Sequence, residues 1–149
     1  MLQIALYIII GIAVLSVIAF FVQERFIFKP EKLKQDFIYK YDVPFEELFF
    51  DVEPGVRING LHFTVTDPLG LVLYFHGNSR SIKGWAKYAK DFYRYKYDVV
   101  LVDYRLAPEH PHPAQLEDSL KVLLWMRSAG RAFGIDPDRI KAMAEEIAE

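Results

Sequence analysis

Leu71–Arg80 reads LVLYFHGNSR, an apolar run that stops at His76-Gly77 and continues into polar residues. A continuous apolar run of this kind is typical of a strand that is covered on both faces. A second such run, DVVLVDY, covers Asp98–Tyr104. The residues between the two runs recur at the helical positions i, i+3, i+4 and i+7, and they are Trp85, Tyr88, Ala89 and Phe92. Two parallel strands joined by a crossover helix predict an open α/β sheet.

The loop His76–Ser79 lies where such a sheet binds its ligands, beyond the carboxyl end of a strand. Gly77 would allow close approach of the backbone, and the loop N–H groups could face a developing negative charge. The alternative is a plain turn between strand and helix, in which Asn78 or Ser79 caps the helix.

The segment before this unit predicts an antiparallel hairpin. EELFFDV (Glu46–Val52) alternates polar and apolar residues, and VRINGLHFTV (Val56–Val65) has β character. Pro54-Gly55 between them is a turn signal. Asn59-Gly60 could form a turn instead, which would split the second strand.

Two further helices are expected downstream. Ala114–Ser128 predicts an amphipathic helix that Gly130 closes. Its expected apolar stripe consists of Leu116, Leu120, Leu123 and Leu124. Asp136 as cap and Pro137 at the first position predict a third helix, with Ile140, Met143 and Ile147 on one face.

The N-terminal run Ile4–Val22 is uncharged and long enough to cross a bilayer as a helix. A cleaved signal peptide is the alternative, but nothing basic precedes the run and Phe20-Phe21-Val22 is a poor cleavage site. Basic residues cluster after the run, at positions 25, 29, 32, 34 and 40, which predicts a cytoplasmic globular part. We therefore expect a single-pass transmembrane helix over residues 1–23, a basic juxtamembrane linker over 24–44, and a globular domain over 45–149.

Composition removes several classes of function. The 149 residues carry a net charge of −2, which does not favour a nucleic-acid surface. The absence of cysteine excludes disulfides, thiolate metal sites and a cysteine nucleophile within this sequence. His110 and His112 could suggest a metal pair, but histidines flanked by prolines in a loop are more often structural, and no metal site is predicted.

Two motifs resemble the α/β-hydrolase superfamily. LYFHGN after a hairpin, followed by a helix and DVVLVDYR, is similar to its membrane-anchored, BEM46-like branch over about Glu46–Asp103. The resemblance implies that the backbone N–H of Asn78 forms half of an oxyanion hole, with His76 and Gly77 shaping the loop.

A second resemblance covers about Asp103–Ile140. DYRLAPEHPHPAQLEDSLKVLLWM, followed by GIDPDRI, is similar to the hormone-sensitive-lipase-like esterases. That branch normally has a His-Gly-Gly loop where this sequence has His76-Gly77-Asn78. The two resemblances imply the N-terminal part of an α/β-hydrolase sheet, a serine hydrolase of esterase, lipase or peptidase type acting on ester or amide small molecules, and no cofactor.

The nucleophile motif of the superfamily is missing from the sequence. No Gly-x-Ser-x-Gly occurs, and the nearest string, MRSAG (Met126–Gly130), places Ser128 at the end of a predicted helix. No catalytic residue is therefore assigned. We expect a chain that is truncated before the nucleophile and inactive alone, or else a non-catalytic membrane-tethered binding or scaffold module. Without a further strand, Leu71–Phe75 would be an exposed apolar sheet edge that favours self-association, unless the C-terminal helix covers it.

Overall fold

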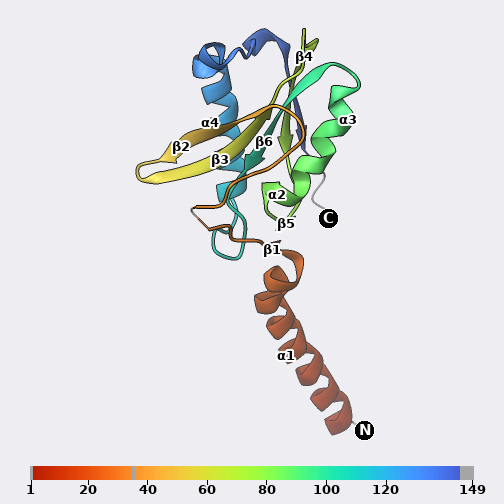
Figure 1. Cartoon of the computed structure of the whole chain (residues 1–149). Coiled ribbons are helices and arrows are strands. Elements are labelled where there is room, and N and C mark those ends of the chain that lie inside the picture. The colour runs from red at the N-terminus through yellow and green to blue at the C-terminus, as the bar shows by residue number, and fades with distance from the viewer. Residues whose placement is uncertain (1, 35, 145–149) are drawn as a thin grey trace.

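The computed structural model describes residues 2–34 and 36–144. A helix, α1 (Leu2–Ile27), projects away from a globular part that begins after the linker (Figure 1). The globular part is a mixed sheet in the order β2-β3-β6-β4-β7. The bounds of its strands are Phe45–Glu53 (β2), Val56–Phe63 (β3), Gly70–Phe75 (β4), Tyr97–Asp103 (β6) and Ile140–Ala144 (β7).

The predicted hairpin is confirmed by antiparallel pairing of β2 with β3. The alternative turn at Asn59-Gly60 is wrong, because β3 runs through both residues and pairs with β6 as well. Gly60 is required for a packing reason: a Cβ there would lie 2.7 Å from Cε2 of Phe50 and 3.0 Å from the carbonyl oxygen of Leu101. The glycine leaves room for the Phe50 ring over the strand.

The expected third helix is wrong. Asp136 does cap a turn, since its carboxylate accepts a hydrogen bond from the Asp138 N–H at 3.1 Å, but the turn is a 3₁₀ helix that ends at Arg139. The chain then pairs in parallel with β4, from Leu71 opposite Ile140 onward. Ladder hydrogen bonds to a neighbouring strand outweigh the local helical pattern. Ile147, the last member of that pattern, lies outside the described residues.

This pairing also corrects the expectation of an exposed edge at Leu71–Phe75. The strand β4 is paired with β6 on one side and with β7 on the other, and its residues Gly70–Tyr74 are buried. The strand β7 is instead at the end of the sheet in the described part of the chain.

Helices cover both faces of the sheet. One face packs against α4 (Ala114–Ala129), and the other packs against α2 (Ile82–Trp85), a 3₁₀ turn (Ala86–Tyr88) and α3 (Ala89–Tyr93), as Figure 1 shows. The predicted crossover helix between β4 and β6 is therefore present as three short helical pieces. Only part of the predicted apolar stripe faces the sheet, because Ala89 is buried whereas Tyr88 is 37% exposed.

The predicted apolar stripe of α4 is wrong. The residues that face the sheet are Asp118, Val122 and Met126, which are buried. Leu116, Leu120 and Leu124 are 54%, 51% and 63% exposed, whereas Leu123 is partly buried against the core. The carboxylate of the buried Asp118 binds Arg105, and this contact sets which face of α4 is directed at the sheet. The spacing of the hydrophobic residues alone does not reveal such a contact.

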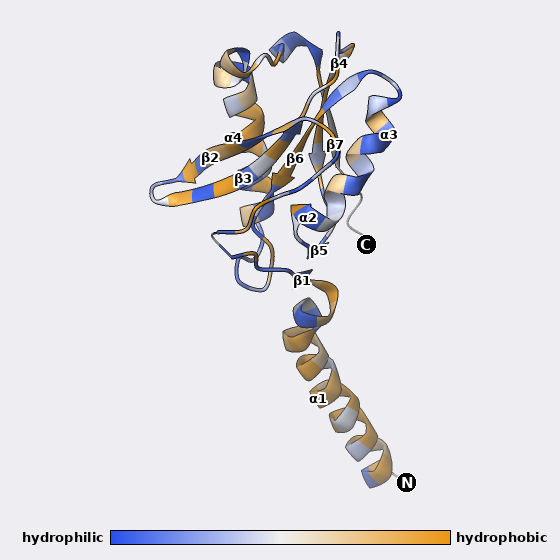
Figure 2. Cartoon of the chain, viewed as in Figure 1, coloured by the Kyte–Doolittle hydropathy of each residue, from blue (hydrophilic) through white to orange (hydrophobic). Residues whose placement is uncertain are grey.

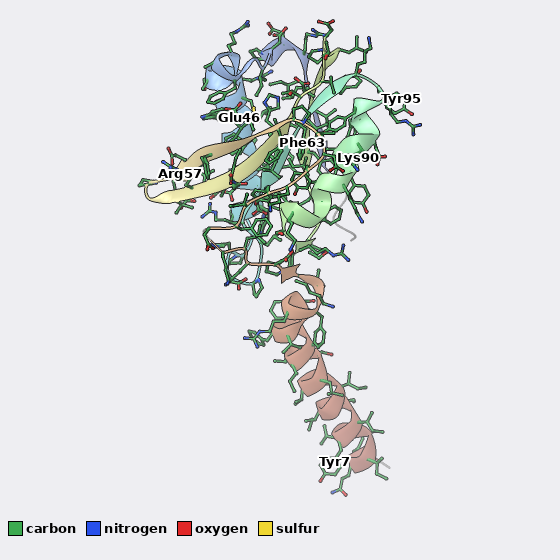
Figure 3. The ribbon with its side chains drawn as sticks, viewed as in Figure 1. Tyr7, Glu46, Arg57, Phe63, Lys90 and Tyr95 are labelled. Atoms are coloured by element: carbon green, nitrogen blue, oxygen red, sulfur yellow. The ribbon has the colours of Figure 1, made fainter. Side chains whose placement is uncertain are left out.

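The helix α1 is apolar over most of its length, with a hydrophilic stretch near its C-terminal end (Figure 2). Its span Leu2–Gln23 is long and apolar enough to cross a membrane, and none of it is buried inside the protein. In Figure 3 the side chain of Tyr7 projects from α1, far from the globular part. Two residues after α1, Lys29–Pro30 forms a short strand, β1, that pairs in parallel with β5 (Ser79–Arg80).

Candidate active site at the ends of strands β4 and β6

His76 anchors the loop that follows β4. Its side chain is buried, and its ring is stacked between Trp85 and Tyr104, with ring centroids 5.9 Å and 4.8 Å away. Its Nδ1 lies 2.7 Å from the carbonyl oxygen of Gly77, and its Nε2 lies 3.3 Å from Oδ1 of Asp103. Both ring nitrogens are thus engaged within the protein, so His76 shapes the loop and is not placed to act as a catalytic base.

Residues at the end of β6, the strand next to β4, also contact this loop. Oδ1 of Asp103 lies 3.4 Å from the N–H of Ile82 at the start of α2, in addition to its contact with His76. The hydroxyl of Tyr104 donates a hydrogen bond to the carbonyl oxygen of His76. The carboxyl ends of two parallel strands are therefore joined through the loop.

Asn78 is partly exposed at the tip of the loop. Its carbonyl oxygen accepts a hydrogen bond of 3.2 Å from the N–H of Lys29, and the indole N–H of Trp85 donates to the carbonyl oxygen of Ser79 at 2.7 Å. The N–H of Asn78 donates to no other described residue. A backbone donor is thereby left available on a loop whose carbonyl groups are fixed.

The linker after α1 crosses this edge of the sheet. Glu31 accepts hydrogen bonds from the hydroxyl of Ser81 at 3.0 Å and from Nζ of Lys83 at 2.8 Å. These two bonds hold the pKa of Glu31 below its usual range. The linker is therefore docked beside the loop by a β pair and by charge.

Arg105 fixes the segment that follows β6. Its backbone N–H and its guanidinium both bind Asp118, and its Nη2 lies 2.6 Å from Oε1 of Glu53. These hydrogen bonds raise the pKa of Arg105 and lower that of Glu53. The network joins β2, the end of β6 and α4 into one unit.

A cavity of about 620 Å³ lies beside the loop, between the linker, the hairpin and the end of β6. Arg80 and Asp103 line it, while His76, Gly77 and Asn78 do not. Arg80 follows the loop in the sequence and Asp103 contacts His76, so the loop adjoins the cavity without lining it.

The remaining sequence candidates are placed away from this edge or are occupied. Ser128 lies in the last turn of α4, where its hydroxyl donates to the carbonyl oxygen of Leu124 at 3.0 Å. Ser81 is buried against Glu31. His110 and His112 are exposed, and the described residues hold no group of three or more side chains suited to a metal ion.

Sequence reasoning missed Asp103 and the linker residues Lys29 and Glu31. Asp103 follows directly after a predicted strand, beside the strand that precedes His76, and that position could have indicated it. The linker contacts have no such signal, because a two-residue strand leaves no periodicity to read.

Comparison with known proteins finds similarity to esterases over a segment that includes this loop. Residues 72–143 match the family model described as alpha/beta hydrolase fold. Carboxylesterase NlhH of Mycobacterium tuberculosis is 40% identical over 80 residues, which cover 51% of this chain and 25% of that protein. Arylesterase of Saccharolobus solfataricus is 36% identical over 76 residues, covering 48% of this chain and 24% of that protein.

Solved esterase structures have the same fold. The thermostable carboxylesterase EstE1 from a metagenomic library superposes with a TM-score of 0.62 and 30% identity, covering 70% of this chain and 38% of that one. An esterase of the archaeon Pyrobaculum calidifontis gives a TM-score of 0.62 at 26% identity, covering 70% and 36%. The chain thus spans about a quarter of the length of the curated relatives and just over a third of these structures.

Proposed function

We propose that the chain supplies the oxyanion side of a serine-esterase site, a proposal supported by the match of residues 72–143 to the alpha/beta hydrolase fold family model and by their similarity to carboxylesterases. The observation that carries the proposal is the His76–Asn78 loop, which follows β4 and leaves the N–H of Asn78 available. The substrate class is an acyl ester or amide.

The proposed chemistry is electrostatic. As a nucleophile adds to the substrate carbonyl, negative charge grows on its oxygen, and the Asn78 N–H donates a hydrogen bond to it. Gly77 lets the substrate approach the backbone, and the stacked, hydrogen-bonded His76 keeps the donor in place. A donor fixed before the reaction needs no reorganisation when the charge forms.

The nucleophile, the acid and the catalytic histidine are not assigned to any residue of this sequence, so the 149 residues alone are proposed to be inactive. In the superfamily that the sequence resembles, the strand next to β4 on the side away from β6 leads to the nucleophile, and β7 has that place here. The sequence that follows Ile140 is KAMAEEIAE, which contains no serine.

We also propose that α1 anchors the protein in a bilayer as a single-pass helix with the globular part in the cytoplasm. This arrangement agrees with the resemblance of residues 46–103 to the membrane-anchored branch of the superfamily. Its support is the length and apolar composition of Leu2–Gln23 and the basic residues that follow.

The first experiment uses the chain itself. Incubation of the reconstituted protein with a fluorophosphonate probe and with p-nitrophenyl acetate should give neither serine labelling nor hydrolysis above a buffer control. Labelling of any serine, located by mass spectrometry, would contradict the proposed inactivity.

A second experiment tests the oxyanion role. The chain is joined after Ala144 to the segment of carboxylesterase NlhH that follows its matched region, and ester hydrolysis is measured. Asn78→Pro removes the N–H and should lower kcat by about 100-fold or more. Asn78→Ala keeps the N–H and is the matched control, which should retain most activity. Equal losses in both variants would show that the backbone N–H is not the donor.

A further inference from the structure

The cavity beside the loop has an apolar wall. Its volume of about 620 Å³ is within the size range of small-molecule sites. The apolar and aromatic residues that line it come from the linker, the hairpin and the end of β6, and they are Pro30, Leu33, Phe37, Tyr39, Phe49, Ile58, Tyr104 and Leu106. This wall suits an alkyl chain.

The carboxylates that line the cavity are all occupied by donors of the protein. Glu31 binds Ser81 and Lys83, as described above. Glu47 accepts a hydrogen bond from the side-chain amide of Asn59, and Asp103 faces His76. The protein's own donors therefore satisfy these carboxylates, and among them Glu31 has a cationic partner in Lys83.

The cations of the lining differ from one another. Lys32 pairs with Glu109 at 2.9 Å, and Arg57, which Figure 3 labels on the hairpin, pairs with Asp51 at 2.8 Å. Neither Lys34 nor Arg80 forms an ion pair with a carboxylate in the part of the chain that the structure describes. These two positive groups therefore have no carboxylate in direct contact, although the charge of Arg80 also helps to lower the pKa of Glu31.

Arg80 is held in an unusual conformation. Its φ is 68°, in the left-handed region that a residue with a side chain rarely adopts. The β pair with Pro30 holds its backbone, and its Cδ lies so close to Gly84 that a Cβ there would be 3.3 Å away. Backbone strain of this kind is concentrated at functional sites.

We propose that this cavity binds a single-chain anionic amphiphile, with the alkyl chain on the apolar wall and an anionic head on Arg80 and Lys34. The cavity begins at Pro30, close after the end of α1 at Ile27, so a ligand from a bilayer has a short path to it. The idea that this ligand is the substrate rests on the proposed function, because the cavity adjoins the Asn78 loop. The idea that the cavity binds such a ligand does not depend on the proposed function.

Binding is measured on the full chain in phosphatidylcholine nanodiscs by saturation-transfer NMR, with empty nanodiscs subtracted. The probes are hexyl phosphate, inorganic phosphate and hexanol. Hexyl phosphate should bind about tenfold or more tightly than either of the others, because it uses the wall and the cations together. Equal affinity for hexyl phosphate and hexanol would overturn the proposal, and so would equal affinity for hexyl phosphate and inorganic phosphate.

Variants locate the site. Arg80→Asn, which tolerates the left-handed backbone, should weaken hexyl phosphate binding about tenfold, whereas Arg80→Lys should retain most of it. Lys34→Gln, in the exposed linker, should weaken it less and tests the site even where Arg80→Asn lowers stability. Lys90→Gln on α3 is the control and should bind as the wild type does (Figure 3). Unchanged affinity in both Arg80→Asn and Lys34→Gln would overturn the assignment. The binding measurement requires no ester hydrolysis. A negative binding result and a negative esterase result can therefore be told apart.

Discussion

At the scale of single residues, buried charge decides where the segment after β6 lies. Asp118 is fully buried and accepts hydrogen bonds from the backbone N–H, Nε and Nη2 of Arg105. A buried ion pair costs desolvation on formation, but removing one partner leaves the other charge uncompensated. The pair therefore acts as a positioning device for the chain between β6 and α4.

Asp118→Asn should lower the free energy of unfolding by about 3 kcal/mol, because Arg105 loses its buried counter-charge. Urea unfolding of the micelle-embedded chain, followed by tryptophan fluorescence, measures this. Asp51→Asn is the matched control, since its ion pair with Arg57 is exposed and its loss should have no measurable effect. Similar losses in the two variants would contradict the structural role of Asp118.

His62 makes the stability of the fold depend on pH. Its side chain is buried, its Nε2 lies 3.7 Å from Oδ2 of Asp98, and burial holds its pKa below the ordinary 6.5 despite that carboxylate. The folded state therefore binds fewer protons than the unfolded state below pH 6.5, and stability falls as the pH decreases through that value. Unfolding free energies at about pH 7.5 and about pH 5.5 should differ more in the wild type than in His62→Leu. An equal difference in both proteins would rule out His62 as the source.

At the scale of elements, local patterns predicted the hairpin, β4, β6 and α4, because each has its own periodicity or turn. The same reasoning failed where a distant partner decides the structure. The Asp136-Pro137 signal forms one 3₁₀ turn, and β4 then captures the following residues as a strand. The loop after β4 was predicted from its own residues, but the docking of Lys29 on Asn78 joins segments about fifty positions apart and has no local signature.

Gly70 tests the pairing of β4 with β7. A Cβ at this position would lie 2.8 Å from the carbonyl oxygen of Arg139, just before β7 begins. Gly70→Ala should therefore destabilise the fold by about 1 to 3 kcal/mol and weaken amide protection at Leu73 and Tyr74 in hydrogen exchange. Leu69→Ala, at an exposed neighbouring side chain, is the control. Unchanged protection in Gly70→Ala would argue against the close approach of the two strands.

At the scale of the whole molecule, the apolar helix α1 and the loop end of the sheet are joined by very few residues. The helix α1 ends at Ile27, and Lys29 already pairs with Ser79 beside the candidate oxyanion loop. If α1 spans a bilayer, the loop is held near the membrane surface by this connection. The proposed orientation then places both the loop and the cavity on the cytoplasmic side.

The absence of cysteine makes this orientation measurable. Ser128→Cys places a thiol at an exposed position of α4, and Gln3→Cys places one at the start of α1. In intact cells, a membrane-impermeant maleimide should label Gln3→Cys but not Ser128→Cys, and permeabilisation should expose Ser128→Cys. Labelling of Ser128→Cys in intact cells would reverse the proposed topology.

The stack of Trp85 on His76 makes the chain an optical reporter of its own loop. The sequence has two tryptophans, and Trp125 packs against Phe50 and Phe133 on the opposite face of the sheet. Replacing Trp125 with phenylalanine would leave a single indole, whose N–H is bonded to the carbonyl oxygen of Ser79. The emission wavelength and lifetime of that indole would then follow the geometry of the loop directly, in a bilayer and without a label.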